Sequence, residues 1–116
     1  MKPFSEFWSR LQSELGKGTE IRNWTAKNGY LGDSFTVAGL TSGYVEIDAP
    51  GAETVQRVPK SDFEAVYAQW TRYCAGAVQR QQIRDTTRFS KYIISIVHHL
   101  EPSNVVREQM PQNRSR

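Results

Sequence analysis

Apolar residues change their spacing twice along this chain, and this pattern constrains the fold more than any other feature. In residues 3–16 they recur every three or four positions, which is the spacing of one face of an α-helix. Between residues 19 and 58 they alternate in short runs separated by turn residues, as in β-strands. From Ser61 the helical spacing returns. Because helices and strands are segregated along the chain, the pattern predicts an α+β fold rather than an alternating α/β fold.

The strand-like part contains four runs rich in β-branched and aromatic residues, at 19–25, 34–40, 44–49 and 53–58. Turn-forming residues separate these runs, and the connection over 28–33 is the longest and the richest in glycine. Short turns between consecutive strands favour antiparallel pairing. We therefore expect an N-terminal helix, a four-stranded curved antiparallel sheet or small open barrel, and then three C-terminal helices.

The C-terminal helices are expected at 61–76, 79–86 and 90–100. The first begins with a capping-box pattern, in which Ser61 is followed three residues later by Glu64. Its wide apolar face predicts that it is the main helix of the core. Ser90 is the expected N-cap of the last helix, and Pro102 is expected to stop it.

Length and composition indicate one domain. The chain has 116 residues, which is near the commonest domain size. We expect a single α+β domain over residues 1–100 and a flexible polar tail over residues 101–116. Cys74 is the only cysteine, so no intrachain disulfide forms. The lack of an apolar leader and of a long apolar run favours a cytoplasmic location without a membrane span.

Charge is distributed unevenly along the chain. Residues 1–71 contain seven Lys and Arg against nine Asp and Glu, whereas residues 72–116 contain eight against three. Seven of these eight basic residues are arginine, the side chain best suited to paired hydrogen bonds with phosphate or carboxylate. This concentration predicts a binding surface for an anionic partner in the C-terminal part.

The segment GAVQRQQIRDTTRFSKYIISIVHHL has two short helical patterns joined by a tight link, and it resembles the helical half of winged-helix domains. The resemblance implies nucleic-acid binding, with the start of the second helix facing bases or phosphates through Arg88, Ser90, Lys91 and Ser95. The residues expected to contact nucleic acid or an acidic partner are Arg72, Arg80, Arg84, Arg88, Ser90 and Lys91. The alternative is that these helices only pack against the core and leave their arginines in solvent.

A second set of candidates lies on the expected sheet and consists of Trp24, Tyr30, Phe35 and Tyr44. Exposed aromatic side chains on a sheet stack bases or line a ligand groove, whereas aromatic residues at alternating strand positions form part of a core. We expect a core role for this set except for Tyr30, since a residue in a glycine-rich turn is rarely buried.

The sequence predicts no catalytic, cofactor or metal site. His98 and His99 are adjacent on a helix, so their side chains point about 100° apart and do not bind one metal ion together. Cys74 beside one of these histidines would make a Cys–His nucleophile. Its position in the apolar stripe of a helix favours an inert buried thiol instead.

The runs VPKSDFEAVYAQWTRYCAG and SKYIISIVHHL resemble small proteins carried on bacterial mobile gene cassettes, such as integron cassettes. This resemblance implies a bacterial origin and an unassigned function, and it transfers no active residues. The leading hypothesis is a non-enzymatic binding module that contacts nucleic acid through its basic C-terminal helices. The alternative is a protein-interaction module that pairs with a copy of itself or with an acidic protein. An enzyme is the least favoured class.

Overall fold

The computed structural model describes residues 2–102, so the tail expected at 101–116 lies almost wholly outside the described residues. One helix precedes the sheet and the other helices follow it, which confirms the predicted α+β order. Within the described residues the elements are α1 (Phe4–Glu14), β1 (Glu20–Thr25), β2 (Gly29–Leu40), β3 (Tyr44–Asp48), β4 (Gln56–Pro59), α2 (Lys60–Tyr67), α3 (Trp70–Cys74), α4 (Arg80–Thr86) and α5 (Ser90–Leu100).

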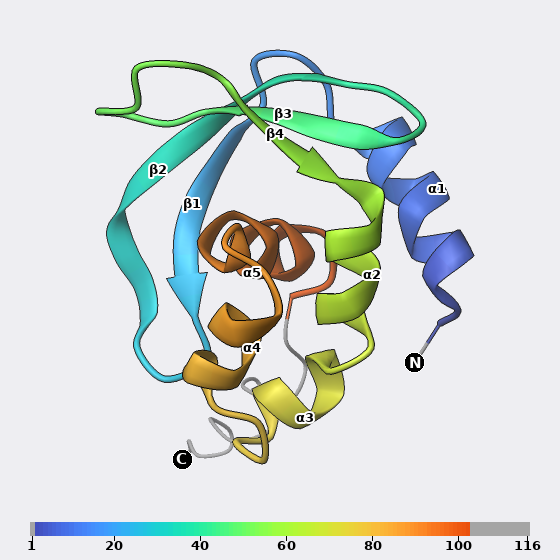
Figure 1. Cartoon of the computed structure of the whole chain (residues 1–116), viewed down its shortest axis with the longest axis vertical. Coiled ribbons are helices and arrows are strands. Elements are labelled where there is room, and N and C mark those ends of the chain that lie inside the picture. Colours follow the sequence, from blue (N-terminus) through green and yellow to red (C-terminus); the bar gives the residue numbers. More distant parts are fainter. Residues whose placement is uncertain (1, 103–116) are drawn as a thin grey trace, which may run out of the picture.

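The strands form one open antiparallel sheet in the order β1-β2-β3-β4, so each strand pairs with its neighbour in the sequence. Of the two expected forms, the curved sheet is the one observed. Figure 1 shows α5 in the middle, with β1 and β2 along one side, β3 and β4 above it, and α2 along the other side. The sheet therefore curves around a central helix.

Helix α5 occupies this position because it is buried over most of its circumference, with its large aliphatic side chains on one broad face and polar residues such as Ser95 and His98 buried beside them. Ile93, Ile94, Ile96 and Val97 have no exposed surface, and Leu100 is 1% exposed. Burial of a side chain of this size stabilises the fold by about 1.5–3 kcal/mol relative to exposure. The last helix, rather than the expected helix over 61–76, is therefore the centre of the core.

An aromatic layer attaches α1 to the rest of the core. The rings of Phe7 and Tyr67 stack with their centroids 4.6 Å apart, and the rings of Trp8 and Phe63 meet edge to face at 5.4 Å. The indole N–H of Trp8 also donates a 3.0 Å hydrogen bond to the carbonyl oxygen of Ser42, between β2 and β3. The N-terminal helix is thus tied both to α2 and to the sheet.

The prediction of one long helix over 61–76 is wrong. The chain leaves the helical conformation at Gln69 (φ −104°, ψ 1°), which separates α2 from α3. After the break the indole of Trp70 lies 6.0 Å from that of Trp24 on β1, centroid to centroid. The helix therefore breaks where the following segment contacts β1, and the spacing of apolar residues in the sequence does not reveal this contact.

The prediction of a loop over 28–33 is also wrong, because most of this segment belongs to β2. Gly29 has a φ of 72°, a left-handed conformation that glycine adopts without steric cost. It closes a tight turn in which Thr25 and Gly29 are already paired across the two strands. The strands of the β1–β2 hairpin are therefore longer, and the turn between them is shorter, than the loop predicted from the glycines at 28–33.

The predicted N-caps, Ser61 for the first C-terminal helix and Ser90 for the last, are wrong because both residues already lie within the helices. Strand β4 ends at Pro59 and α2 begins at the next residue, so Ser61 already lies in the first helical turn and no side chain caps the helix. Ser90 is the first residue of α5 rather than its N-cap. Thr87 acts just before this helix, where its Oγ1 accepts a 3.0 Å hydrogen bond from the N–H of Phe89.

The hydroxyl of Tyr67 donates a 3.0 Å hydrogen bond to the carbonyl oxygen of Lys2, and burial together with the charge of Glu101 raises its pKa from 10.0 to about 12. A pKa that is higher in the folded state stabilises the fold below the unfolded value, and this stabilisation is lost as the pH rises through 10 towards 12. In urea titrations between about pH 9 and pH 12, the free energy of unfolding of Tyr67→Phe should fall less steeply than that of the wild type. Tyr44→Phe is the control, and an unchanged slope in Tyr67→Phe would contradict the prediction.

Candidate ligand-binding pocket

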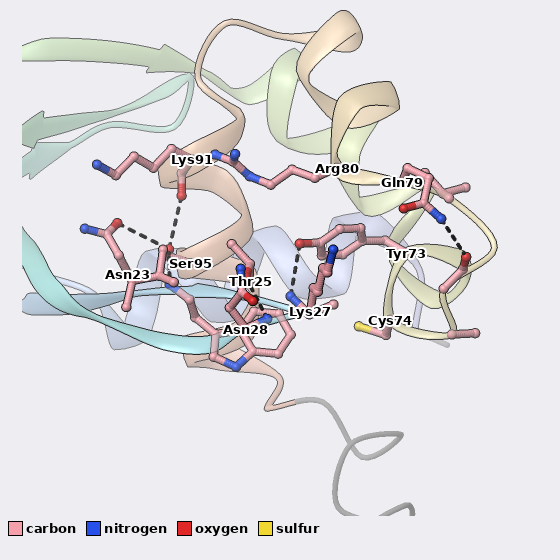
Figure 2. Close-up of a pocket in the computed structure, with 16 residues that line it drawn as sticks. Asn23, Thr25, Lys27, Asn28, Tyr73, Cys74, Gln79, Arg80, Lys91 and Ser95 are labelled. Carbon is pink, nitrogen blue, oxygen red and sulfur yellow. Dashed lines mark hydrogen bonds between the residues drawn. The ribbon is translucent and has the colours of Figure 1, made fainter.

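A pocket of about 670 Å³ opens between the β1–β2 hairpin, the loop that joins α3 to α4, and the first turns of α5. Figure 2 shows side chains from these three segments around one hollow. Its volume lies within the range of about 300–1,000 Å³ that is usual for small-molecule sites. A second hollow, beside His98 and Tyr30, measures only about 110 Å³. The larger pocket is therefore the candidate site.

A β-bulge builds the floor of this pocket. The pairing of β1 with β2 shifts register beside Asn23, where one residue of β1 faces three residues of β2, so the bulge itself lies in β2. On β1, Asn23, Trp24 and Thr25 are all buried in place of the usual alternation. The backbone N–H of Trp24 donates a 3.0 Å hydrogen bond to Oγ of Ser95 on α5. Ser95 Oγ in turn donates to the carbonyl one helical turn earlier, at 3.1 Å. These hydrogen bonds tie β1 to the central helix, and Asn23, which faces the bulge, is part of the pocket lining.

Three basic side chains line the pocket, and each comes from a different element. Lys27 belongs to the β1–β2 turn, Arg80 begins α4, and Lys91 lies in the first turn of α5. Figure 2 shows Arg80 extended from α4 in the direction of Lys91. Among the described residues no Asp or Glu lines this pocket. The pocket is therefore electropositive, and this polarity favours an anionic ligand.

The guanidinium of Arg80 is held with one hydrogen-bond donor unused. Its Nε atom is buried and has no hydrogen-bond partner within residues 2–102. Lys91 is better compensated, since its Nζ lies 3.8 Å from Oδ2 of Asp33, but both side chains are at least half exposed and such a pair contributes little. Arg80 therefore places a guanidinium in the pocket lining whose Nε forms no hydrogen bond with the described residues, and leaving a buried donor unpaired costs free energy.

Tyr73 brings a phenolic hydroxyl to the pocket wall. Its Oη accepts a 3.1 Å hydrogen bond from the backbone N–H of Ala26. Burial raises the pKa of this phenol, while the hydrogen bond from Ala26 and the charge of Arg80 oppose the rise. The phenol is therefore protonated near neutral pH and remains a hydrogen-bond donor. Apolar side chains such as Val78 complete the wall, so the lining suits a ligand with both an apolar and an anionic part.

The structure brings together two of the basic residues predicted to contact nucleic acid or an acidic partner. Arg80 and Lys91 both line the pocket, together with Ser95, which the winged-helix resemblance also placed towards a partner. Arg72 is exposed on α3 and lies outside the pocket lining. Ser90 is 2% exposed, so its side chain does not present a surface to a partner.

The remaining two predicted contacts, Arg84 and Arg88, also lie outside the pocket lining. The guanidinium of Arg84 donates a 2.8 Å hydrogen bond to Oε1 of Gln81, on the same helix. The guanidinium of Arg88 lies over the ring of Phe89, 4.7 Å from its centroid. Both side chains are exposed, so Arg84 and Arg88 are not part of the candidate site.

Sequence reasoning missed Asn23, Lys27 and Tyr73 as site residues. Lys27 lies in the turn before Asn28-Gly29, a position that only the folded hairpin brings near α4. Asn23 is a polar residue in a run of buried residues, and that break in alternation is the one signal that the sequence contains. Tyr73 shares the apolar stripe of its helix and is indistinguishable there from a core residue.

The aromatic residues of the sheet follow the prediction closely. Trp24 and Phe35 are 4% and 2% exposed and belong to the core, and Tyr44 is half-buried. Tyr30 is 51% exposed, as expected for the exception in the turn. The guanidinium of Arg22 lies over its ring at 4.0 Å from the centroid. These four residues therefore do not form an exposed aromatic surface on which bases could stack.

The histidines and the cysteine lie in different surroundings. The imidazole of His98 is buried and stacks on Trp24 with centroids 3.8 Å apart and an angle of 4° between the rings, while His99 is exposed. Cys74 is partly exposed at the pocket, so the prediction of a buried thiol is wrong. Cys74 is the last residue of α3, next to the α3–α4 loop that borders the pocket, so its side chain packs only partly against the core. In the described part of the chain no group of three or more His, Cys, Asp and Glu is placed to hold a metal ion.

Comparison with known proteins adds no relative: no family model, no curated protein and no solved structure matches this chain significantly. The resemblance to mobile-cassette proteins therefore stays a prediction. Among the described residues no helix has the length and apolar character needed to cross a membrane.

The hydrogen bond from the Trp24 N–H to Ser95 supports the bulge and can be tested by mutation. Ser95→Ala leaves a buried backbone donor without its partner, so we expect a loss of about 1–3 kcal/mol in the free energy of unfolding. Ser90→Ala is the matched control, since Ser90 is on the same helix, is 2% exposed and forms no side-chain hydrogen bond within residues 2–102. Urea denaturation measures both, and equal losses in the two variants would show that the bond does not support the bulge.

Proposed function

We propose that this protein is a non-enzymatic module that binds a small organic anion in the pocket beside α5. One observation carries the proposal: basic side chains from three separate elements line a pocket of small-molecule size whose described lining contains no acid. Arg80 and Lys91 would hold the anionic group, and Lys27 would add charge from the hairpin. Apolar residues such as Trp24 and Val78 would enclose the rest of the ligand.

A small molecule fits this arrangement better than a nucleic-acid duplex does. A duplex requires basic residues spread over an exposed surface that matches its backbone. Here Arg80 and Lys91 lie in a hollow, whereas Arg72, Arg84 and Arg88 lie outside its lining. Ser90, expected at the start of a recognition helix, is buried. Nucleic-acid binding is therefore the less favoured hypothesis, and a binding measurement with duplex DNA tests it.

The chemistry of the pocket lining supports a proposal of binding rather than catalysis. Cys74 is the one cysteine of the chain, and His98 and His99 line the smaller hollow rather than the pocket. The described pocket lining therefore combines neither a carboxylate nor a histidine with a nucleophile. Donors and cations of this kind hold an anion without providing a base to transform it.

Benzoate is a suitable first ligand because it joins a carboxylate to an apolar ring. We expect benzoate to bind in an NMR titration and benzamide, its neutral counterpart, to bind at least about ten-fold more weakly, because a hydrogen bond to a charged group is worth about 1.5–3 kcal/mol. Arg80→Gln should weaken benzoate binding by a similar factor. Arg84→Gln, a change of the same kind on the same helix but outside the pocket, should leave it unchanged.

Two further measurements decide between the proposals. Benzoate should slow the labelling of Cys74 by a maleimide, since this thiol lines the same pocket. Duplex DNA, followed by fluorescence anisotropy at low salt, should not bind. Equal loss of benzoate affinity in both arginine variants would refute the pocket, and DNA binding that depends on Arg84 and Arg88 would favour the nucleic-acid hypothesis in its place.

A further inference from the structure

Asn23 places an amide with unused hydrogen-bonding capacity in the pocket floor. Its side chain is 2% exposed and lines the pocket. Figure 2 shows its oxygen directed towards Ser95, and the distance from Ser95 Oγ to Asn23 Oδ1 is 3.5 Å, at the limit of a hydrogen bond. The single proton of Ser95 already has a nearer acceptor, the Lys91 carbonyl, at 3.1 Å. The amide nitrogen of Asn23 has no acceptor among residues 2–102.

Tyr73 adds a second neutral donor. Its oxygen accepts a hydrogen bond from the Ala26 N–H, and the part of the chain that the structure describes contains no acceptor for its own proton. The residue is 4% exposed, so bulk solvent reaches it only slightly. Its phenol stays protonated near neutral pH because burial raises its pKa. A protonated, nearly buried hydroxyl with a free proton is a binding group for an acceptor atom.

The pocket therefore presents two kinds of donor. Arg80 and Lys91 are cationic, whereas Asn23 and Tyr73 are neutral. Among the described residues Arg80 Nε, and neither neutral donor, is a fully buried side-chain atom without a partner, so the neutral donors are open to a ligand or to water in the pocket. A simple carboxylate bound at the cations would leave the neutral donors to water. A ligand that also carries a neutral acceptor would pair them.

We propose that the natural ligand is a small organic anion with a separate carbonyl oxygen, such as an oxo acid or an N-acyl amino acid. Its carboxylate would lie at Arg80 and Lys91, and its carbonyl oxygen would accept hydrogen bonds from Asn23 Nδ2 or Tyr73 Oη. A carbonyl oxygen accepts two hydrogen bonds and brings no donor that needs a partner of its own. This assignment rests on the proposed anion-binding function and names the class of ligand for the same pocket.

Unbranched five-carbon acids test the proposal with one group changed at a time. Pentanoate carries the carboxylate alone, 2-oxopentanoate and 4-oxopentanoate add a carbonyl oxygen at two distances from it, and 4-hydroxypentanoate adds a hydroxyl. At least one oxo acid should bind about five-fold or more tightly than pentanoate in an NMR titration, as one added neutral hydrogen bond allows. The hydroxy acid should not match the better oxo acid.

Variants connect the preference to the two residues. In Tyr73→Phe and in Asn23→Ala, the ratio of oxo-acid affinity to pentanoate affinity should fall towards one for at least one of the pair. Tyr30→Phe is the matched control, since Tyr30 is exposed and lies outside the pocket lining, and it should keep the wild-type ratio. Circular dichroism of each variant confirms that it is folded, and having two independent variants keeps the test decisive if one of them unfolds.

The outcomes separate this inference from the function on which it rests. If pentanoate binds in an Arg80-dependent manner but no oxo acid binds more tightly, the carbonyl assignment is overturned and anion binding stands. A hydroxy acid that binds as tightly as the oxo acids also overturns the assignment. If none of the acids binds, both proposals fall.

Discussion

The enclosure of α5 by the curved sheet is the interaction on which the rest of the structure depends. The helix buries five large aliphatic side chains, which are Ile93, Ile94, Ile96, Val97 and Leu100. Exposed apolar surface costs free energy in water, so these side chains must be covered, and the helix also buries polar residues on its neighbouring faces. The sheet covers one side and the top, and α2 covers the other (Figure 1). A flat sheet covers one face of such a helix only, so the curvature follows from the burial.

The pocket lies at the end of α5 where the sheet and the helix are connected through β1. The hydrogen bond from the Trp24 N–H to Ser95 holds β1 against α5, next to Asn23, which faces the bulge in β2. Beyond this point the hairpin turn and the α3–α4 loop do not close over the helix, and the hollow between them remains open to solvent. At this end Arg80 Nε is buried and has no hydrogen-bond partner among the described residues, a donor that contributes nothing to the stability of the fold.

Much of the fold could be predicted from residue spacing alone. The order of elements, the antiparallel pairing and the buried stripe of the last helix are each encoded within a few consecutive turns or strands. The failures lie where distant contacts compete with local preference. The helix over 61–76 breaks at Gln69, where the following segment contacts β1, and the glycines at 28–33 serve a strand that pairs from its first residue. The spacing of apolar residues shows which face of an element is buried, but it does not show which other element that face contacts.

The candidate site shows the same division more sharply. The sequence by itself determined that positive charge is concentrated after residue 71, that Cys74 has no disulfide partner, and that an apolar helix ends the domain, since each of these depends on residue identity and order alone. Only the tertiary structure decided which charges act together. Arg80 and Lys91 share a pocket with Lys27, a residue more than fifty positions earlier in the chain than Arg80, while Arg72, Arg84 and Arg88 lie outside it. The reason is physical: a binding site is a set of distances in space, and these distances are established only when the sheet curves around α5.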